Sequence, residues 1–336
     1  MPDGYLLVPG TGGITLMDSA GNDLGYPGRM ELGVRTGGLL AAPASALVDL
    51  LSMEHAPGQA APVKTSLRTG VSIRPGHALQ LAYELVPPTF NTFLYDWRAD
   101  LLWNAALLRD FLEQRRPPGG RWRVAAHSQG ALLVVLASKL FPAPDAFARC
   151  VAAVALVAAP LAGTVNAARA LVVGDLMGPA GEQAFQAIVR TWPAIYQMVP
   201  SWNAFLPPGG GVPRSATDPA SWAGLPGLSD DFLGRARAAQ ERLRDPLAYM
   251  DGDVGVAIVL ARNRPTGANL ELDGAGPTGT SHDFVLGDSL VPYDQTLDWL
   301  GAAGRPFLKT LTGPVREHAF VFDDPTVMNT VKQVLG

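Results

Sequence analysis

The sequence predicts an α/β fold, with a mostly parallel central sheet and helices on both of its faces. Short and almost wholly apolar segments, such as Val151 to Ala158, are typical of strands buried on both faces. Segments with helical spacing of apolar residues, such as Ala99 to Arg115, alternate with them along the chain. The composition is 48% hydrophobic and 17% charged, which provides for a large core and excludes a disordered chain.

The first half of the chain alternates between strand and helix patterns. The apolar run Tyr5 to Val8 predicts the first strand, because a glycine-rich turn follows it directly. A helix from Ala99 to Arg115 is expected to end there, because a Pro-Pro-Gly-Gly run follows. The other elements expected in this half are a helical patch at 46–53, strands at 93–96, 121–126 and 151–158, and a helix at 131–140.

The second half of the chain begins with helical and irregular segments and then returns to segments predicted as strands. From 164 to 246, helical pieces alternate with Trp-Pro, Pro-Pro and triple-glycine breaks. The elements expected after 164 are helices at 182–190 and 231–244, strands at 254–260 and 307–311, and a closing helix at 325–335 with Asp324 as its N-cap. We therefore expect one domain over residues 1–336 with two insertions, a cap-like one at 30–90 and a helical lid at 164–250.

Charge, cysteine content and hydropathy argue against several classes of protein. A net charge of −4 predicts no attraction to nucleic acid. Cys150 is the single cysteine, so no intrachain disulfide forms, and its apolar setting favours a small core residue over a reactive thiol. We see neither a signal peptide nor an apolar run of membrane-spanning length, so a cytoplasmic protein is expected, with secretion by a signal-independent route left open. Cys, His and carboxylate residues do not cluster at ligand spacing, so neither a metal nor another cofactor is expected.

The junction Ala126-His127-Ser128-Gln129-Gly130 carries the functional prediction. Of the thirteen serines, Ser128 alone has Gly or Ala two positions before it and Gly two positions after it. An apolar strand pattern precedes it and an apolar helix pattern follows. This is the context of a nucleophile on a tight strand-to-helix turn, and it predicts an α/β-hydrolase fold with Ser128 as the nucleophile. His127 is expected to support the site by packing rather than act as a base, since neighbouring strand residues point to opposite faces.

A serine nucleophile needs a base, and the base needs an orienting carboxylate. This fold places them in the chain order Ser, Asp or Glu, then His. His318 lies after the last strand and before the last helix, where the base is expected, whereas His282 precedes the best acid candidate. That candidate is Asp288, in the turn Gly287-Asp288-Ser289-Leu290-Val291-Pro292, and the alternatives left open are Asp273, Asp283 and Asp294.

Acyl transfer also needs two backbone N–H groups directed at the developing oxyanion. One is expected from Gln129, directly after the nucleophile. The other is expected from the turn Gly10-Thr11-Gly12-Gly13 at the end of the first strand, from Thr11 in particular. A phosphate-binding loop is not favoured there, because no Gly-Lys-Ser/Thr follows. A tight connection without a catalytic part is the alternative.

Seven short segments along the chain match motifs of a known protein family and occur in the same order as in that family. They are Val8-Pro9-Gly10-x-x-Gly13, Tyr95-Asp96-Trp97-Arg98, Ala126 to Gly130, Ala158 to Thr164, Arg190 to Gln197, Gly287-Asp288-x-x-Val291-Pro292 and Glu317-His318. In this order the chain resembles the lecithin:cholesterol acyltransferase-like family, which includes lysosomal phospholipase A2. The resemblance implies ester hydrolysis or acyl transfer on lipids through an acyl-enzyme. It puts Ser128, Asp288 and His318 in the triad positions and Thr11 and Gln129 in the oxyanion positions.

The chain departs from that family at three places. Ser289-Leu290 stands where the family usually has Gly-Thr, the elbow begins with Ala126, and one cysteine cannot form the family's cap disulfide. Without that disulfide, docking to a membrane through the cap loop is in doubt. Transient contact with a membrane or a lipid interface stays open.

The aromatic-rich insertion at 164–250 bears on the substrate. It is expected to form an apolar acyl pocket under a movable lid, with packing of the lid onto the core as the alternative for its aromatic residues. The candidate substrate-binding residues are Gly12, Trp97, Trp192 and Tyr196. The function expected is a serine hydrolase or acyltransferase on lipid-like esters. The alternatives are an esterase, lactonase, thioesterase or amidase on a non-lipid substrate, and a non-catalytic binding module.

Overall fold

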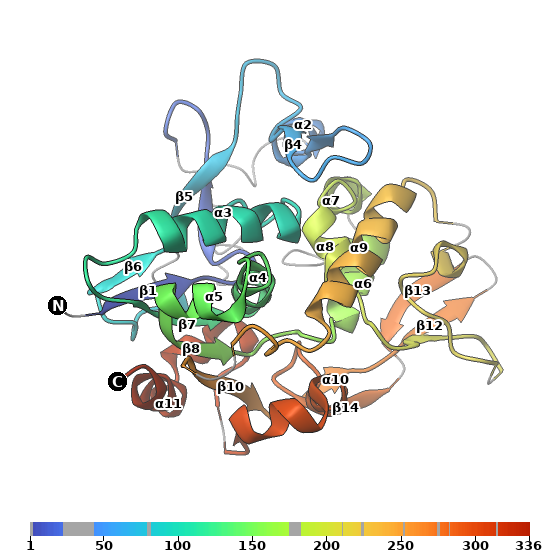
Figure 1. Ribbon diagram of the computed structural model, residues 1–336. Coiled ribbons are helices and arrows are strands. Elements are labelled where there is room, and N and C mark those ends of the chain that lie inside the picture. Colours follow the sequence, from blue (N-terminus) through green and yellow to red (C-terminus); the bar gives the residue numbers. More distant parts are fainter. Residues whose placement is uncertain are drawn as a thin grey trace.

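A six-stranded sheet in the order β15-β10-β8-β7-β1-β6 forms the centre of the molecule, and each neighbouring pair is parallel (Figure 1). Its strands are β1 (Gly4–Val8), β6 (Phe90–Thr92), β7 (Trp122–His127), β8 (Val151–Val157), β10 (Gly255–Ala261) and β15 (Leu308–Leu311). The structure is a computed structural model and describes residues 3–22, 44–78, 82–174, 183–209, 211–222, 225–250, 253–273, 276–281, 283–313 and 315–336.

Alternate residues along the strands enter two separate cores. In β1, Leu6 and Val8 belong to one buried cluster while Leu7 belongs to another. Val124 and Ala125 of β7 divide in the same way. Because successive side chains of a strand point to opposite faces, a sheet with apolar residues at every position must be covered on both sides.

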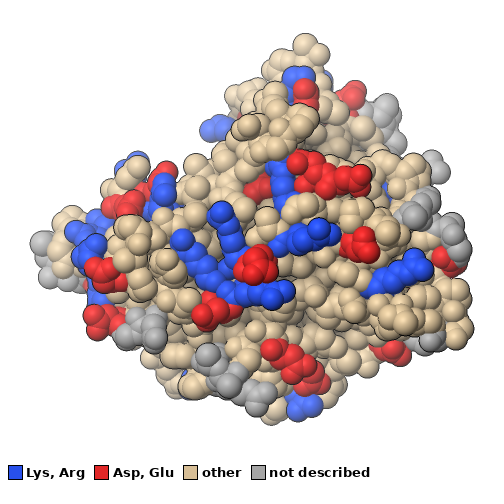
Figure 2. All heavy atoms as spheres, turned by 45° about the vertical axis from the view of Figure 1, so that its right-hand side comes forward, with Lys and Arg blue, Asp and Glu red and all other residues tan. Residues whose placement is uncertain are grey.

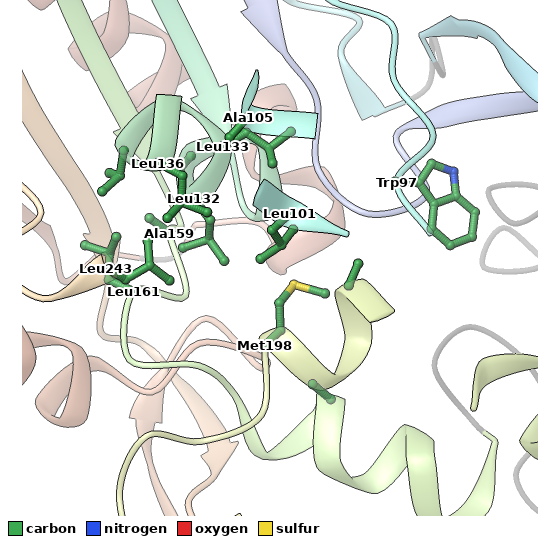
Figure 3. Packing of buried hydrophobic residues seen from close by; sticks show 14 of the residues in the cluster. Trp97, Leu101, Ala105, Leu132, Leu133, Leu136, Ala159, Leu161, Met198 and Leu243 are labelled. Atoms are coloured by element: carbon green, nitrogen blue, oxygen red, sulfur yellow. The ribbon is translucent and has the colours of Figure 1, made fainter. Parts of the chain in front are cut away.

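Helices supply both covers. On one face lie α3 (Leu101–Gln114), α4 (Gln129–Ser138) and α5 (Pro144–Cys150), and on the other lies α11 (Pro325–Leu335) (Figure 1). Every residue of α4 is buried, including Gln129 and Ser138 at its ends, as its largely apolar pattern predicts. Figure 3 shows α4 side chains such as Leu132 in one cluster with Leu101 of α3 and with Met198.

Further helices pack beside this layer. They are α2 (Ala44–Leu51), α6 (Val165–Val173), α7 (Gln183–Val189), α8 (Pro193–Gln197), α9 (Asp230–Leu243) and α10 (Tyr293–Gly304), with 3-10 turns at Pro219–Trp222, Arg305–Phe307 and η4 (His318–Asp323). Side-chain caps fix several starts: Thr164 accepts from the Asn166 N–H, and Ser229 accepts from the Phe232 N–H. As expected, Asp324 caps α11 by accepting from the N–H groups of residues 326 and 327.

Short strands form smaller sheets outside the centre. They are β2 (Ile14–Met17), β3 (Glu54–His55), β4 (Pro62–Lys64), β5 (Arg74–Ala78), β9 (Phe205–Leu206), β11 (Arg264–Gly267), β12 (Leu270–Asp273), β13 (Gly276–Ser281) and β14 (Phe284–Gly287). Sequence patterns did not predict them, because each is short and several are rich in Gly, Pro or Thr. The β11–β14 pair matters most for the site, since its last strand ends immediately before Asp288.

One sequence expectation is corrected. The strand expected at 93–96 is the strand β6 at 90–92, because the ladder with β1 begins at the pair Tyr5 and Phe90. Cys150 is the last residue of α5 and is a buried free thiol, as expected of a small core residue. Glu182 of the expected helix at 182–190 and part of the expected cap at 30–90 lie outside the described residues.

The surface carries mixed charge. In the face drawn in Figure 2, Lys and Arg side chains are interspersed with Asp and Glu. Within the described parts of the chain, the helices are all too short or too polar to cross a membrane.

Candidate active site

Ser128 lies on a strained turn between β7 and α4. Its backbone has φ 52° and ψ −122°, a conformation that costs a non-glycine residue free energy and that clusters at functional sites. Gly130 makes the turn feasible: a Cβ there would lie 2.2 Å from the Val8 carbonyl oxygen. The small residue Ala126 before the turn is fully buried. The chain therefore projects the hydroxyl of Ser128 at the carboxyl end of the sheet, beside the end of β1.

Ser128, His318 and Asp288 form one hydrogen-bonded chain. The Ser128 Oγ lies 2.7 Å from Nε2 of His318, and Nδ1 of His318 lies 2.8 Å from Oδ2 of Asp288. The backbone N–H of His318 also donates to the backbone carbonyl oxygen of Asp288 at 3.1 Å. An ionised carboxylate only accepts, so Nδ1 carries the proton and Nε2 is free to accept from the serine hydroxyl. The three side chains are buried, with 6%, 7% and 1% exposure in the order Ser128, His318, Asp288.

Asp288 is held in its charged form. Burial alone would raise the pKa of this carboxyl, but the charge of His318, the hydrogen bond to its ring and two backbone N–H donors lower it below the ordinary value. The donors are Leu290 and Val291, at 3.0 and 2.7 Å from Oδ1. Ser289 supports this turn with φ 83°, a conformation rare in residues other than glycine.

The other acid candidates lie elsewhere. Asp283 is exposed and accepts a bond from Asn269, Asp294 lies 3.9 Å from Arg262, and Asp273 is exposed at the end of β12. The carboxylate bonded to the His318 ring is that of Asp288. The alternative base His282 lies outside the described residues.

The glycine-rich turn after β1 faces the nucleophile. A Cβ on Gly10 would lie 2.9 Å from the Ser128 Cβ, so glycine is needed there for close approach. The Thr11 hydroxyl donates to the side-chain oxygen of Gln129 at 2.6 Å. The side-chain nitrogen Nε2 of Gln129 donates to the Trp97 backbone carbonyl oxygen at 2.9 Å. Gln129 is the first residue of α4, whose opening N–H groups have no partner within the helix. The backbones of Thr11 and Gln129 are thereby held together beside Ser128.

A cavity of about 220 Å³ opens onto this site. Thr11, Gly12, Ser128 and His318 are among the residues that line it. The remaining wall is mixed, with apolar and polar side chains: Gly13, Ala82, Tyr83, His127, Pro160, Thr164, Asn166, Ala167, Met198, Ser289, Leu290, Glu317 and Ala319. Because Glu317 is exposed, the cavity reaches the surface.

Trp97, Trp192 and Tyr196 are not among the residues that line this cavity, which corrects their assignment to substrate binding. Each is fully buried, and the two tryptophan rings pack edge to face at 5.1 Å. The Trp97 Nε1 donates to the Ile14 carbonyl and the Trp192 Nε1 to the Leu51 carbonyl, while the Tyr196 hydroxyl donates to the Arg190 carbonyl. Their polar atoms are engaged by backbone, so these aromatics tie the segments around α2 and α8 to the core.

His127 and Tyr83 belong to the site in a way that sequence patterns did not reveal. Nε2 of His127 lies 3.0 Å from the His318 carbonyl oxygen, and Nδ1 lies 3.0 Å from the Tyr83 hydroxyl. Burial, together with the nearby His318, lowers the pKa of His127 to about 3. A supporting role for His127, rather than that of a base, therefore stays a prediction, although His127 lines the same cavity as Ser128 instead of pointing to the opposite face. Tyr83 lacks any local motif, and only the pairing of distant segments brings it here.

Comparison with known proteins supports the fold. No protein-family model matches the sequence, and no curated protein matches it. The chain is similar in structure to a chain of the Tle4–Tli4 complex, with a TM-score of 0.56, 13% identity and coverage of 100% of this chain and 99% of that one. A phospholipase, PlaB from Legionella pneumophila, aligns at a TM-score of 0.34 and 10% identity over 76% of this chain and 56% of its own, too low to carry an argument. The likeness to the first, with the parallel sheet and the helices on both faces, identifies an α/β-hydrolase fold.

Proposed function

We propose that the protein is a serine hydrolase that cleaves carboxylic esters, with Ser128 as nucleophile, His318 as general base and Asp288 as the acid that orients it. The observation that carries this proposal is the unbroken chain Ser128–His318–Asp288, with links of 2.7 and 2.8 Å. Such a chain raises the nucleophilicity of a serine hydroxyl, which is otherwise weak.

The proposed reaction passes through an acyl-enzyme. Ser128 Oγ attacks the ester carbonyl carbon while Nε2 of His318 takes its proton. The Thr11 and Gln129 backbone N–H groups donate to the resulting oxyanion, a contribution worth about 3 kcal/mol for one donor. His318 then returns the proton to the departing alcohol. Water, or a second alcohol in an acyl transfer, attacks the acyl-enzyme by the same route and releases Ser128.

A lipid-like acyl group is the substrate we favour. Apolar side chains such as Ala82, Pro160, Met198 and Leu290 form much of the cavity wall. The order of short motifs, similar to that of the lecithin:cholesterol acyltransferase-like family, points the same way. We assign residues 164–250 as a lid, because Thr164, Asn166, Ala167 and Met198 contribute to this wall, and residues 30–90 as a cap that contributes Ala82 and Tyr83.

The size of the cavity favours a second candidate, an esterase for short acyl chains. The volume of the cavity is about 220 Å³. That is below the range of about 300–1,000 Å³ usual for sites that enclose a drug-sized ligand. A long acyl chain would need the lid to move so that the cavity becomes larger.

Hydrolysis of p-nitrophenyl esters from C2 to C16 tests the proposal and separates the two candidates. Wild type should hydrolyse at least part of the series and react with a fluorophosphonate probe, whereas Ser128→Ala should do neither. An optimum at C8 or longer supports a lipid substrate, and an optimum at C2 to C4 supports the short-chain esterase. A wild type that neither hydrolyses any ester nor reacts with the probe would contradict an enzymatic role and favour a binding module.

A further inference from the structure

Three hydrogen bonds run from the glycine-rich turn to the backbone of the base. The Gly10 N–H donates to the Tyr83 hydroxyl oxygen at 2.9 Å. That hydroxyl lies 3.0 Å from Nδ1 of His127, and Nε2 of His127 lies 3.0 Å from the His318 carbonyl oxygen. All the atoms concerned are buried. The chain therefore connects four segments that the sequence separates widely.

The direction of each of these bonds is fixed by chemistry. A carbonyl oxygen only accepts, so Nε2 of His127 must carry a proton. Burial keeps His127 neutral, with its pKa lowered to about 3, so Nδ1 has no proton and must accept. The Tyr83 hydroxyl therefore donates to Nδ1, and its oxygen accepts from Gly10. Donors and acceptors match along the whole chain, as a buried polar network requires.

The surrounding rings hold this chain in place. The Tyr83 ring packs against Phe322 with centroids 5.6 Å apart, and the His127 ring packs against Phe322 at 5.4 Å. The Glu84 N–H donates to Asp323 Oδ1 at 2.8 Å, which joins the Tyr83 segment to the end of η4. Since η4 begins with His318, the segment is joined directly to the end of the turn that carries the base, and through His127 to its start.

We propose that Tyr83 and His127 are positioning residues, which hold the oxyanion-binding turn and the base in register with Ser128. Thr11 follows Gly10 directly, so the bond to the Gly10 N–H restrains the turn that carries the Thr11 N–H. A bond to the His318 carbonyl restrains the main chain that supports the imidazole. A neutral His127 adds no second positive charge when His318 becomes protonated, although the two rings lie 5.1 Å apart. The inference rests on the proposed function, because it concerns that same site.

The test uses Tyr83→Phe, His127→Phe and the double variant, with Tyr196→Phe as the matched control. Tyr196 is also buried, and its hydroxyl also makes two hydrogen bonds, to the Arg190 carbonyl and from the Ser229 N–H, but it does not line the cavity. Loss of its hydroxyl should lower stability as much as loss of the Tyr83 hydroxyl, without reaching the catalytic atoms. The measurements are Tm, kcat and KM on p-nitrophenyl butyrate, and the rate constant of labelling by a fluorophosphonate.

Tyr83→Phe should lower kcat and the labelling rate constant by about ten- to a hundredfold at a nearly unchanged KM. Tyr196→Phe should leave both near wild type at a similar Tm. Because the two positioning residues act through one chain, the double variant should fall little further than the worse single variant. A Tyr83→Phe rate within twofold of the control, or a double variant whose loss is the product of the single losses, would overturn the inference.

Nitrogen NMR of wild-type histidines gives a readout that needs neither turnover nor a folded variant. His127 should keep its proton on Nε2, with Nδ1 as acceptor, and should not titrate between pH 8 and 5. A His127 ring that protonates in that range would contradict the chain. A wild type that shows this signature but neither hydrolyses nor labels would instead refute the proposed function, and with it the catalytic effect of the two residues.

Discussion

Mild acid should destabilise the folded protein through His127. In the unfolded chain this imidazole has an ordinary pKa of 6.5, and in the folded protein burial, together with the nearby His318, lowers its pKa to about 3. Between these values the unfolded state binds a proton that the folded state does not. Stability is therefore fully present above pH 6.5 and is lost as the pH falls towards 3. One pKa unit corresponds to about 1.4 kcal/mol, so the loss from pH 7 to pH 5 is about 2 kcal/mol.

The assay is urea unfolding of wild type and His127→Gln at pH 7, 6 and 5, followed by tryptophan fluorescence. Glutamine does not titrate, so the difference between the two proteins should shrink by about 2 kcal/mol from pH 7 to pH 5. His55, whose pKa burial also lowers, is present in both proteins and cancels in the comparison. Equal dependence on pH in the two proteins would refute the argument that His127 is buried in its neutral form.

Three further substitutions test other parts of the account. Asp288→Asn should keep the backbone bonds of the turn but favour the wrong tautomer of the base, which lowers kcat by about 10⁴-fold in ester hydrolysis; a loss below tenfold would count against Asp288 as the triad acid. Gly130→Ala puts a Cβ 2.2 Å from the Val8 carbonyl oxygen at the end of β1, so fluorophosphonate labelling should be lost and the free energy of unfolding should fall by about 1–3 kcal/mol. Labelling at the wild-type rate would show that the elbow tolerates a side chain. Arg98→Met leaves Asp96 buried without its partner at 2.7 Å and should lower the free energy of unfolding in urea by about 3–5 kcal/mol. Arg149→Met breaks the exposed ion pair with Asp145 and should lower it by less than about 1 kcal/mol. Equal losses in the two variants would contradict this reasoning.

Local patterns predicted the elements whose chemistry is local. The elbow is visible in the sequence because a small residue, a serine and a glycine must stand at fixed spacing for β7 and α4 to approach. The end of α3 and the cap of α11 are also short-range effects of Pro, Gly and Asp. The chain order of the α/β-hydrolase fold then singled out His318 and Asp288. In the structure His318 contacts Ser128, 190 residues away along the chain, and Asp288, 30 residues away.

Features that depend on distant partners were missed or misplaced. Apolar residues at 93–96 resemble a strand as well as those at 90–92 do, and only pairing with β1 decides between them. The aromatic residues Trp97 and Trp192 were assigned to substrate, since an aromatic-rich insertion suits a pocket and a packed core equally. Tyr83 carries no sequence signal, because its role comes from contacts with residues 44 and 73 positions away.

The most direct test of the central claim is identification of the residue that a fluorophosphonate modifies. Wild type and Ser128→Ala would each be treated with the probe, digested and mapped by mass spectrometry. The account predicts one adduct per wild-type molecule, on the peptide that contains Ser128, and no adduct on the variant. An adduct on another serine, or equal labelling of Ser128→Ala, would contradict the claim that Ser128 is the nucleophile.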